Sequence, residues 1–93
     1  MLQIQFFSLI RMLLKRDAIE IPWVEGDTVQ SVLDKTQAQI ATPFLHKLLD
    51  GSGTAHTGTI ILVNRKNILH LQGLQTPLAD GDVLAFFPPG AGG

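Results

Sequence analysis

The residues with the clearest chemical potential lie at the end of the sequence. The last four residues, Gly90-Ala91-Gly92-Gly93, carry no side chain larger than a methyl group, so the only reactive group they offer is the α-carboxylate of Gly93. A carboxylate activated as a mixed anhydride with AMP is an electrophile, and a sulfur nucleophile converts it to a thiocarboxylate. Because glycine has no Cβ, an extended backbone of this composition fits a narrow channel in another protein. We therefore expect a partner enzyme to supply ATP, magnesium and positioning.

Two prolines separate this segment from the rest of the chain. Pro88 and Pro89 follow an apolar run, and proline cannot continue the hydrogen-bond ladder of a strand. We predict a folded domain over residues 1–87 and a flexible C-terminal tail over residues 88–93. The alternative is that the glycines form an incidental chain end, since termini are commonly disordered.

Composition excludes several classes of function. The 93 residues suit one compact domain, and the formal net charge of −1 gives no electrostatic basis for binding nucleic acid or an anionic membrane. The sequence has no cysteine, and its three histidines lack metal-binding spacing, so we expect no metal site and no cofactor bound by the chain itself. The longest apolar run, residues 6–14, is far shorter than the roughly 20 residues of a membrane span. We expect a cytoplasmic protein.

Alternating hydrophobic residues predict two strands near the N-terminus. The pattern over residues 2–10 predicts a first strand, with Arg11 on its polar face. Residues 19–23 alternate in the same way and predict a second, antiparallel strand. Pro22 cannot donate to a ladder, so this strand is expected at an edge of the sheet.

The middle of the chain predicts helices. Thr28 suits an N-cap, and the apolar residues that follow it up to Ile40 have helical spacing. Thr42 and Pro43 predict the start of a short second helix over residues 43–49.

Strands return in the second half. Residues 59–63 predict a central strand, residues 68–71 a shorter one, and residues 83–87 a strongly apolar last strand. We therefore predict an α+β domain with a mixed sheet of four to five strands packed against one main helix and a short second helix. Parallel first and last strands at the sheet centre, as in a β-grasp, would explain their apolar character. The order of elements leaves a ferredoxin-like arrangement open.

The sequence resembles the MoaD/ThiS group of ubiquitin-like sulfur carriers, and most of all its MoaD branch, the small subunits of molybdopterin synthase. The resemblance covers essentially the whole chain, and its most specific part is the segment from Asp80 to Gly93. The residues that carry it are Phe6-Phe7 with Arg11, Thr28-Val29 with Val32-Leu33, Ile61 to Asn64 with Asn67-Ile68, Gly73-Leu74, Thr76-Pro77-Leu78, Asp80-Gly81-Asp82, Ala85-Phe86-Phe87-Pro88-Pro89 and Gly92-Gly93.

The resemblance implies a β-grasp fold and a carrier without enzymatic activity of its own. It implies that a ubiquitin-activating-type adenylyltransferase adenylates Gly93, and that a desulfurase or rhodanese-type donor supplies the sulfur. Gly92 has no side chain and would let Gly93 enter a narrow active-site channel. In the molybdopterin branch the sulfur passes to a pterin precursor inside a complex with a large subunit, which we expect as a further partner.

The resemblance also implies a docking surface. The candidate partner-binding residues are Phe7, Arg11, Phe87, Pro88, Pro89, Gly90 and Ala91. Phe86 and Phe87 are neighbours on a strand and point to opposite faces, so at most one of them belongs to the core. Arg11 has the alternative interpretation of a solvated charge.

Other functions remain open at this point. The sulfur could serve the synthesis of thiazole, cysteine or another product. The same activated glycine could modify lysines of other proteins, or the chain could be a β-grasp interaction module with an incidental tail. The chain also departs from the group at Arg65, where many relatives place glycine after asparagine, so we expect a different turn type there.

Overall fold

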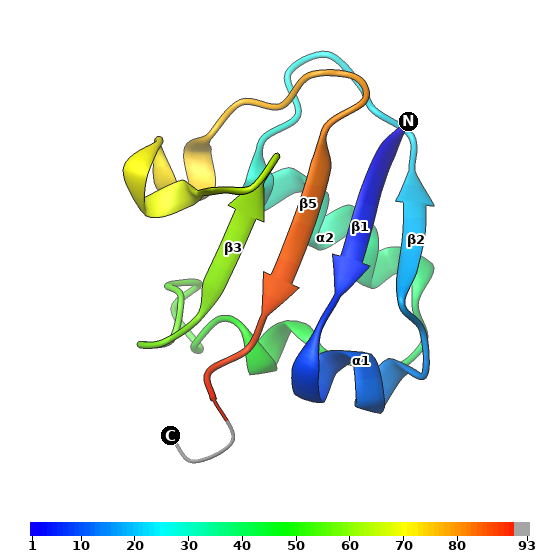
Figure 1. Cartoon of the computed structure of the whole chain (residues 1–93), viewed down its shortest axis with the longest axis vertical. Helices are drawn as coiled ribbons and strands as arrows, with labels where there is room; N and C mark the ends of the chain where they lie inside the picture. The colour runs from blue at the N-terminus through cyan, green and yellow to red at the C-terminus, as the bar shows by residue number, and fades with distance from the viewer. Residues whose placement is uncertain (91–93) are drawn as a thin grey trace.

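A five-stranded mixed sheet organises the molecule (Figure 1). The structure is a computed structural model that describes residues 1–90. The strand order is β2-β1-β5-β3-β4, and the strands are β1 (Leu2–Phe6), β2 (Ala18–Ile21), β3 (Ile60–Val63), β4 (Lys66–Asn67) and β5 (Val83–Phe87). Two α-helices, α1 (Ser8–Leu14) and α2 (Val29–Gln39), and three 3-10 helices (Leu45–Lys47, Ile68–His70 and Gly73–Gln75) complete the described elements.

The first and last strands lie side by side at the centre of the sheet. β1 and β5 are parallel, with Gln3 opposite Val83 and Phe6 opposite Phe86. β2 and β3 flank this pair, and both run antiparallel to their neighbour. The predicted parallel pair, the predicted strand over residues 83–87 and the edge position of β2 before Pro22 are therefore confirmed.

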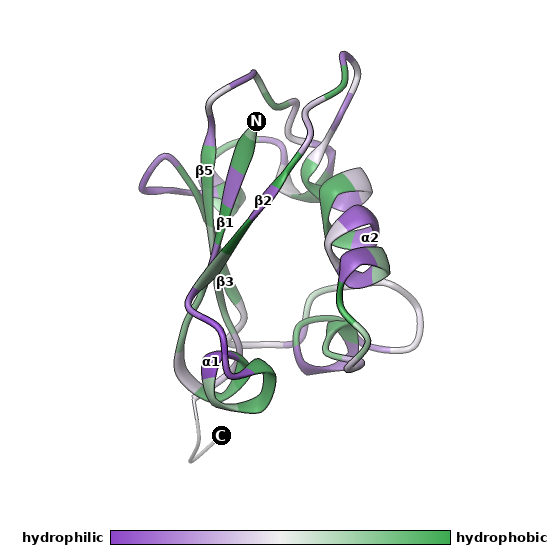
Figure 2. Ribbon diagram, turned by 90° about the vertical axis from the view of Figure 1, so that its right-hand side faces the viewer, coloured by the Kyte–Doolittle hydropathy of each residue, from purple (hydrophilic) through white to green (hydrophobic). Residues whose placement is uncertain are grey.

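One face of the sheet carries the hydrophobic core. Figure 2 shows α2 lying across this face. Alternate residues of the strands point toward α2 and are buried with its apolar residues and with the segment after it, namely Leu2, Ile4, Phe6, Ile61, Leu84, Phe86, Val29, Val32, Leu33 and Phe44. The ring of Phe6 contacts the rings of Phe44 and Phe86 edge to face, at centroid distances of 5.8 and 6.2 Å. Edge-to-face packing favours the quadrupoles of the rings and adds to the burial of their area.

The start of α2 follows the predicted cap. The hydroxyl of Thr28 accepts a hydrogen bond from the Ser31 N–H at 3.2 Å, and the Thr28 N–H donates to the Ser31 hydroxyl at 2.9 Å. This reciprocal pair satisfies two backbone donors at the helix N-terminus.

The predicted first strand is too long. It ends at Phe6, and α1 occupies Ser8–Leu14, which the pattern assigned to strand and turn. Ile10 and Leu14, four residues apart, are the buried residues of α1, whereas Met12 between them is exposed. Alternation would bury all three, so the helical period explains the pattern better. The predicted position of Arg11 on the first strand is therefore wrong, because Arg11 lies on α1.

Two other segments differ from expectation because side chains hold their backbone. In place of a helix opening at Pro43 there is only the 3-10 helix Leu45–Lys47, where Gln37 Oε1 accepts the N–H groups of Phe44 and Leu45. In place of a strand over residues 68–71, the 3-10 helix Ile68–His70 follows β4, and the Asn67 side chain accepts the Leu69 N–H at 2.9 Å.

The turn between β3 and β4 also corrects an expectation. Val63 pairs with Lys66, so the loop has two residues, and Asn64 and Arg65 both have positive φ, 50° and 71°. Positive φ at both central residues is the requirement of a type I′ turn. The chain thus keeps this turn type although Arg65 replaces the usual glycine.

Candidate functional site

The C-terminal strand is paired on both sides up to the point where the chain leaves the sheet. β5 pairs with β1 over Val83–Phe86 and with β3 over Leu84–Phe87. Pro88 is buried, Pro89 is half-buried and Gly90 is exposed. The chain therefore becomes accessible at Gly90.

A neighbouring loop packs against the second proline. A Cβ added at Gly58 would lie 3.5 Å from Cβ of Pro89. Gly58 also has φ +92°, a conformation that residues with a Cβ rarely adopt. Glycine at position 58 thus suits the turn, whereas a Cβ there would make only an ordinary van der Waals contact with Pro89.

The predicted reactive residues, Ala91, Gly92 and Gly93, lie outside the residues that the structure describes. Their roles stay predictions. The predicted division into residues 1–87 and a tail of residues 88–93 also stays a prediction.

The second face of the sheet, which we call the open face, begins beside this exit. It is formed by the alternate residues that point away from α2, and no helix covers it within residues 1–90 (Figure 2). Its lining residues enclose a shallow hollow of about 510 Å³. The apolar residues of this hollow are Phe7, Leu62, Val83, Ala85 and Phe87.

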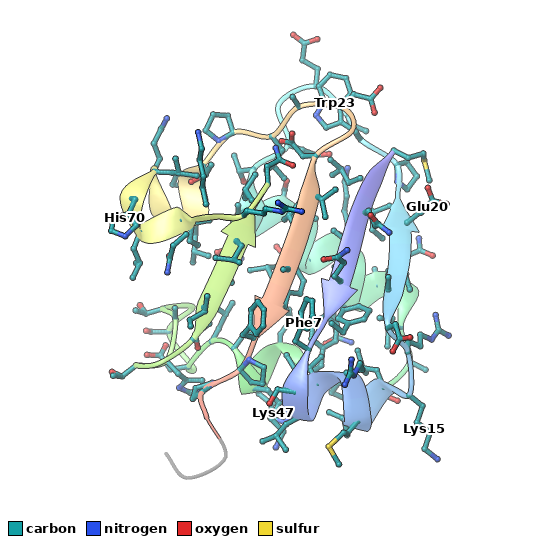
Figure 3. The ribbon with its side chains drawn as sticks, viewed as in Figure 1. Phe7, Lys15, Glu20, Trp23, Lys47 and His70 are labelled. Atoms are coloured by element: carbon teal, nitrogen blue, oxygen red, sulfur yellow. The ribbon has the colours of Figure 1, made fainter. Side chains whose placement is uncertain are left out.

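Two predicted docking residues meet on the open face. The rings of Phe7 and Phe87 stack with their centroids 4.4 Å apart and their planes 8° from parallel. Figure 3 shows the ring of Phe7 lying over the sheet next to β5. Both side chains are half-buried, whereas Phe86 is fully buried in the core. The prediction that Phe86 and Phe87 point to opposite faces is confirmed.

The other end of the hollow is polar. Its residues are Gln3 and Gln5 of β1, and Asn64 and Arg65 of the turn after β3. Asn64 is fixed there, because its amide donates to Asp82 Oδ1 at 2.8 Å and accepts the Val83 N–H at 2.9 Å. Sequence reasoning did not single out these four residues as a site. The alternation of β1 and β5 would have found the two glutamines.

Helix α1 adds exposed apolar residues near the exit of the chain. It lies at the end of the sheet where β5 finishes (Figure 1). Leu9, Met12 and Leu13 are exposed on it, Met12 by 71%. Arg11 is 54% exposed, and its Nε lies 4.0 Å from Asp17 Oδ1. An exposed pair at this distance contributes little to stability, so Arg11 is accessible to a partner.

One buried carboxylate lies just before α2. Asp27, 6% exposed, accepts hydrogen bonds from Lys35 Nζ at 2.6 Å, the Val24 N–H at 2.9 Å and the Ser31 hydroxyl at 2.9 Å. Burial raises the pKa of Asp27, but the hydrogen bonds from Lys35, Val24 and Ser31 outweigh it and hold the pKa below its ordinary value. This ion pair joins the start of α2 to its second turn and is structural.

The turn residues Asp80 and Asp82 also have local partners. The N-terminal ammonium group of Met1 donates to Asp80 Oδ1 at 2.5 Å, and this bond lowers the pKa of Asp80. Asp82 Oδ2 accepts the Ala79 N–H at 2.8 Å. Both carboxylates hold the loop before β5, as expected for aspartates in a turn.

Residues 1–90 contain no group of three or more histidine, cysteine, aspartate or glutamate side chains that could hold a metal ion. Within the same residues, none of the helices has the length and apolar character that crossing a membrane requires.

Comparison with known proteins places the chain among ubiquitin-like proteins. The sequence model described as the ThiS family matches residues 4–93. Small archaeal modifier protein 3 of Haloferax volcanii is 32% identical over 92 residues, which are 99% of this chain and 98% of that protein.

Solved structures agree with the fold. The solution structure of the Haloferax volcanii HVO 2177 protein has a TM-score of 0.76 and 30% identity, and the match covers 99% of this chain and 85% of that one. The crystal structure of the BexX/CysO complex of Amycolatopsis orientalis contains a chain with a TM-score of 0.79 and 22% identity, matched over 100% of both chains. The predicted β-grasp, ubiquitin-like fold is confirmed.

Proposed function

We propose a carrier function from one premise: the chain belongs to the ThiS family, a family of ubiquitin-like sulfur carriers and modifiers. In this proposal the Gly93 carboxylate attacks the α-phosphate of ATP in a ubiquitin-activating-type adenylyltransferase, and pyrophosphate leaves. The terminal sulfur of a persulfide on a desulfurase or rhodanese-type donor then attacks the acyl carbon, AMP leaves, and an acyl disulfide forms. A second thiol of the partner enzymes attacks this disulfide, is itself oxidised to a disulfide, and leaves a thiocarboxylate on Gly93. The chain is the carrier in both steps, and the partner enzymes supply the catalytic groups.

The exit of the chain beside the open face is the observation that carries this proposal. Pro88 is buried and Gly90 is exposed, so the chain leaves the body only three residues before Gly93. Three residues of fully extended chain span at most about 10 Å. An enzyme that binds Gly93 in its active site must therefore also contact the body of this domain.

The surface next to the exit suits that contact. The Phe7–Phe87 stack, the hollow of the open face and the exposed residues of α1 together present apolar groups around the point of exit. Aromatic and aliphatic side chains of this kind are the usual anchors of protein interfaces. We propose that the adenylyltransferase docks here, with Arg11 and Pro89 at the rim.

We also propose which molecule receives the sulfur. The ending Ala85-Phe86-Phe87-Pro88-Pro89 resembles the molybdopterin branch, which favours a pterin precursor as acceptor and a molybdopterin synthase large subunit as partner. A second candidate is conjugation to lysines of other proteins, favoured by the 32% identity with a small archaeal modifier protein over nearly the whole length of both chains.

One experiment tests the common step. The full chain is incubated with ATP, magnesium, a purified adenylyltransferase of this type and a sulfur donor, and its intact mass is measured. We expect the mass increase of one oxygen replaced by sulfur, located at Gly93. A chain lacking Gly92 and Gly93 is the control and should stay unchanged. An unchanged mass of the full chain with several such enzymes would refute the carrier function.

A second measurement separates the acceptors. The thiocarboxylate form is offered either to a pterin precursor with a candidate large subunit or to a cell extract with ATP. Loss of the sulfur with formation of a dithiolene product supports the pterin acceptor. Peptides that carry the C-terminal glycine on a lysine amine support conjugation.

A further inference from the structure

Arg65 occupies a backbone position that favours glycine. It is the second central residue of the type I′ turn between β3 and β4, with φ +71°. A residue with a Cβ is less stable than glycine in this left-handed region. Stability of the turn alone therefore favours glycine at position 65, and the arginine side chain needs another explanation.

The guanidinium of Arg65 has no partner within residues 1–90. The ion pairs of the described chain are Met1–Asp80, Arg11–Asp17 and Lys35–Asp27, and no hydrogen bond involves the Arg65 side chain. Glu20 is the acidic residue of the open face and lies opposite Gln3 on β2. Three strand spacings, about 14 Å, separate β2 from β3, which is too far for an ion pair with Arg65.

The side chain of Arg65 borders the hollow of the open face, whereas its neighbour does not. Arg65 lines the hollow together with Leu62, Val83, Ala85 and Phe87. Lys66 instead lines a separate depression that includes Leu71 and Pro77. The turn thus sends two adjacent cations to two different surfaces, and only Arg65 brings charge to the hollow.

The surroundings of Arg65 indicate what it binds. One guanidinium with the amides of Gln3 and Gln5 over an apolar floor suits a single carboxylate flanked by apolar side chains, because arginine binds a carboxylate through two parallel hydrogen bonds. A nucleic acid would need several cations, which this hollow lacks.

We propose that Arg65 is a specificity-determining residue, which pairs with a carboxylate of the adenylyltransferase whose apolar side chains cover Leu62 and Phe87. This inference rests on the proposed function. Its consequence is that the chain selects, among related enzymes, one with an acidic residue opposite the β3–β4 turn.

The test uses the full chain and a purified adenylyltransferase that adenylates it. The KM for the chain is measured by ATP–pyrophosphate exchange, at low and at high salt. We expect Arg65→Gly to raise the KM about fivefold at low salt, and Arg65→Glu about thirtyfold, because like charges at an interface repel. Both effects should shrink at high salt, since salt screens exposed charges. Lys66→Gln, which removes the adjacent charge on the other surface, is the matched control and should leave the KM unchanged.

The same set of variants includes a control for correct folding. Arg65→Gly should unfold at the same temperature as the unmodified chain or at a higher one, so a raised KM is not a folding defect. Reversal of one carboxylate on the enzyme to lysine should restore the KM of Arg65→Glu.

Three results overturn the inference. If exchange depends on Gly93 but Arg65→Gly and Arg65→Glu leave its KM unchanged, the inference fails and the proposed function stands. If the unmodified chain gives no exchange at all, both fail together. If the unmodified chain sediments as a dimer and Arg65→Gly as a monomer, Arg65 serves self-association instead.

Discussion

The two faces of the sheet use the same strands for different purposes. Phe6 and Phe86 are fully buried between the sheet and α2. Phe87, the next residue of β5, and Phe7, the extended residue directly after β1, stack on the open face and stay half-buried. Because side chains alternate along a strand, adjacent residues of one type divide between the core and the surface.

This difference shows how a small domain gains a binding surface without losing its core. α2 closes one face, and among the described residues no second layer closes the other. The same parallel pair, β1 and β5, therefore supplies stability on one side and exposed aromatic area on the other. Substitutions on the two faces should have separable effects.

Removing a core ring should have the largest effect. Phe86→Ala deletes a fully buried side chain that contacts Phe6, and we expect a loss of about 3–5 kcal/mol in the free energy of unfolding. Urea unfolding followed by circular dichroism measures it. Phe87→Ala is the matched control, with the same atoms removed from the open face, and should lose about 1 kcal/mol. Equal losses for the two variants would show that the faces do not differ as described.

The ion pair under the N-terminus of α2 should come next. Asp27→Asn removes the charge that binds Lys35 and Ser31, and we expect a loss of about 2 kcal/mol at neutral pH. The folded state lowers the pKa of Asp27 below its ordinary 3.8, so its contribution is complete above that value and disappears as the pH falls through the lower, folded-state pKa.

The free energy of unfolding, measured between pH 7 and pH 2, tests whether this contribution is lost in acid. The unmodified chain should lose stability in acid more steeply than Asp27→Asn, and the two should converge at low pH. Phe87→Ala should keep the acid dependence of the unmodified chain. A variant that is as stable as the unmodified chain at neutral pH would contradict the assigned role of the ion pair.

The open face should matter more for binding than for stability. Phe87→Ala removes an anchor beside the exit of the chain, and we expect the KM of adenylation to rise about tenfold. The exchange assay described above measures it. Leu69→Ala, at an exposed leucine of the 3-10 helix after β4, is the control and should bind as the unmodified chain does. If Phe87→Ala binds normally, the partner contacts another surface.

The smallest expected effect is the coupling of the two stacked rings. In a double-mutant cycle, Phe7→Ala and Phe87→Ala should show an interaction of about 1 kcal/mol in unfolding free energy, because their centroids are 4.4 Å apart. Phe7 and Phe86 provide the comparison, since they lie on opposite faces, and should be additive. Additivity of Phe7 and Phe87 would mean that the stack contributes nothing beyond the area each ring buries.

Sequence patterns predicted the centre of the fold well. The strand Val83–Phe87 and the cap at Thr28 follow from local rules of alternation and capping. The parallel pairing of β1 with β5 was expected from the β-grasp fold that the family resemblance implies, because the order of elements alone left a ferredoxin-like arrangement open. The pattern also separated Phe86 from Phe87 correctly. In these segments local preference and tertiary packing agree.

The failures occurred where one pattern admits two structures. Residues 6–14 are apolar enough to fit either the two-residue period of a strand or the roughly 3.6-residue period of a helix. Only the packing of Ile10 and Leu14 against the core selects the helix α1. The bend at Asn67 and the short turn at Leu45 depend on single side-chain hydrogen bonds, which periodicity does not contain. The left-handed Arg65 was missed because the rule for type I′ turns expects glycine.

The adjacency of β1 and β5 has a consequence for the synthesis of the protein. The centre of the sheet joins residues that are far apart in the sequence, as Gln3 with Val83 and Phe6 with Phe86. A nascent chain on the ribosome cannot complete this sheet until β5 has been translated, and contacts so distant in sequence form slowly. A chain that stops before Val83 therefore lacks the central strand β5 and cannot form this sheet.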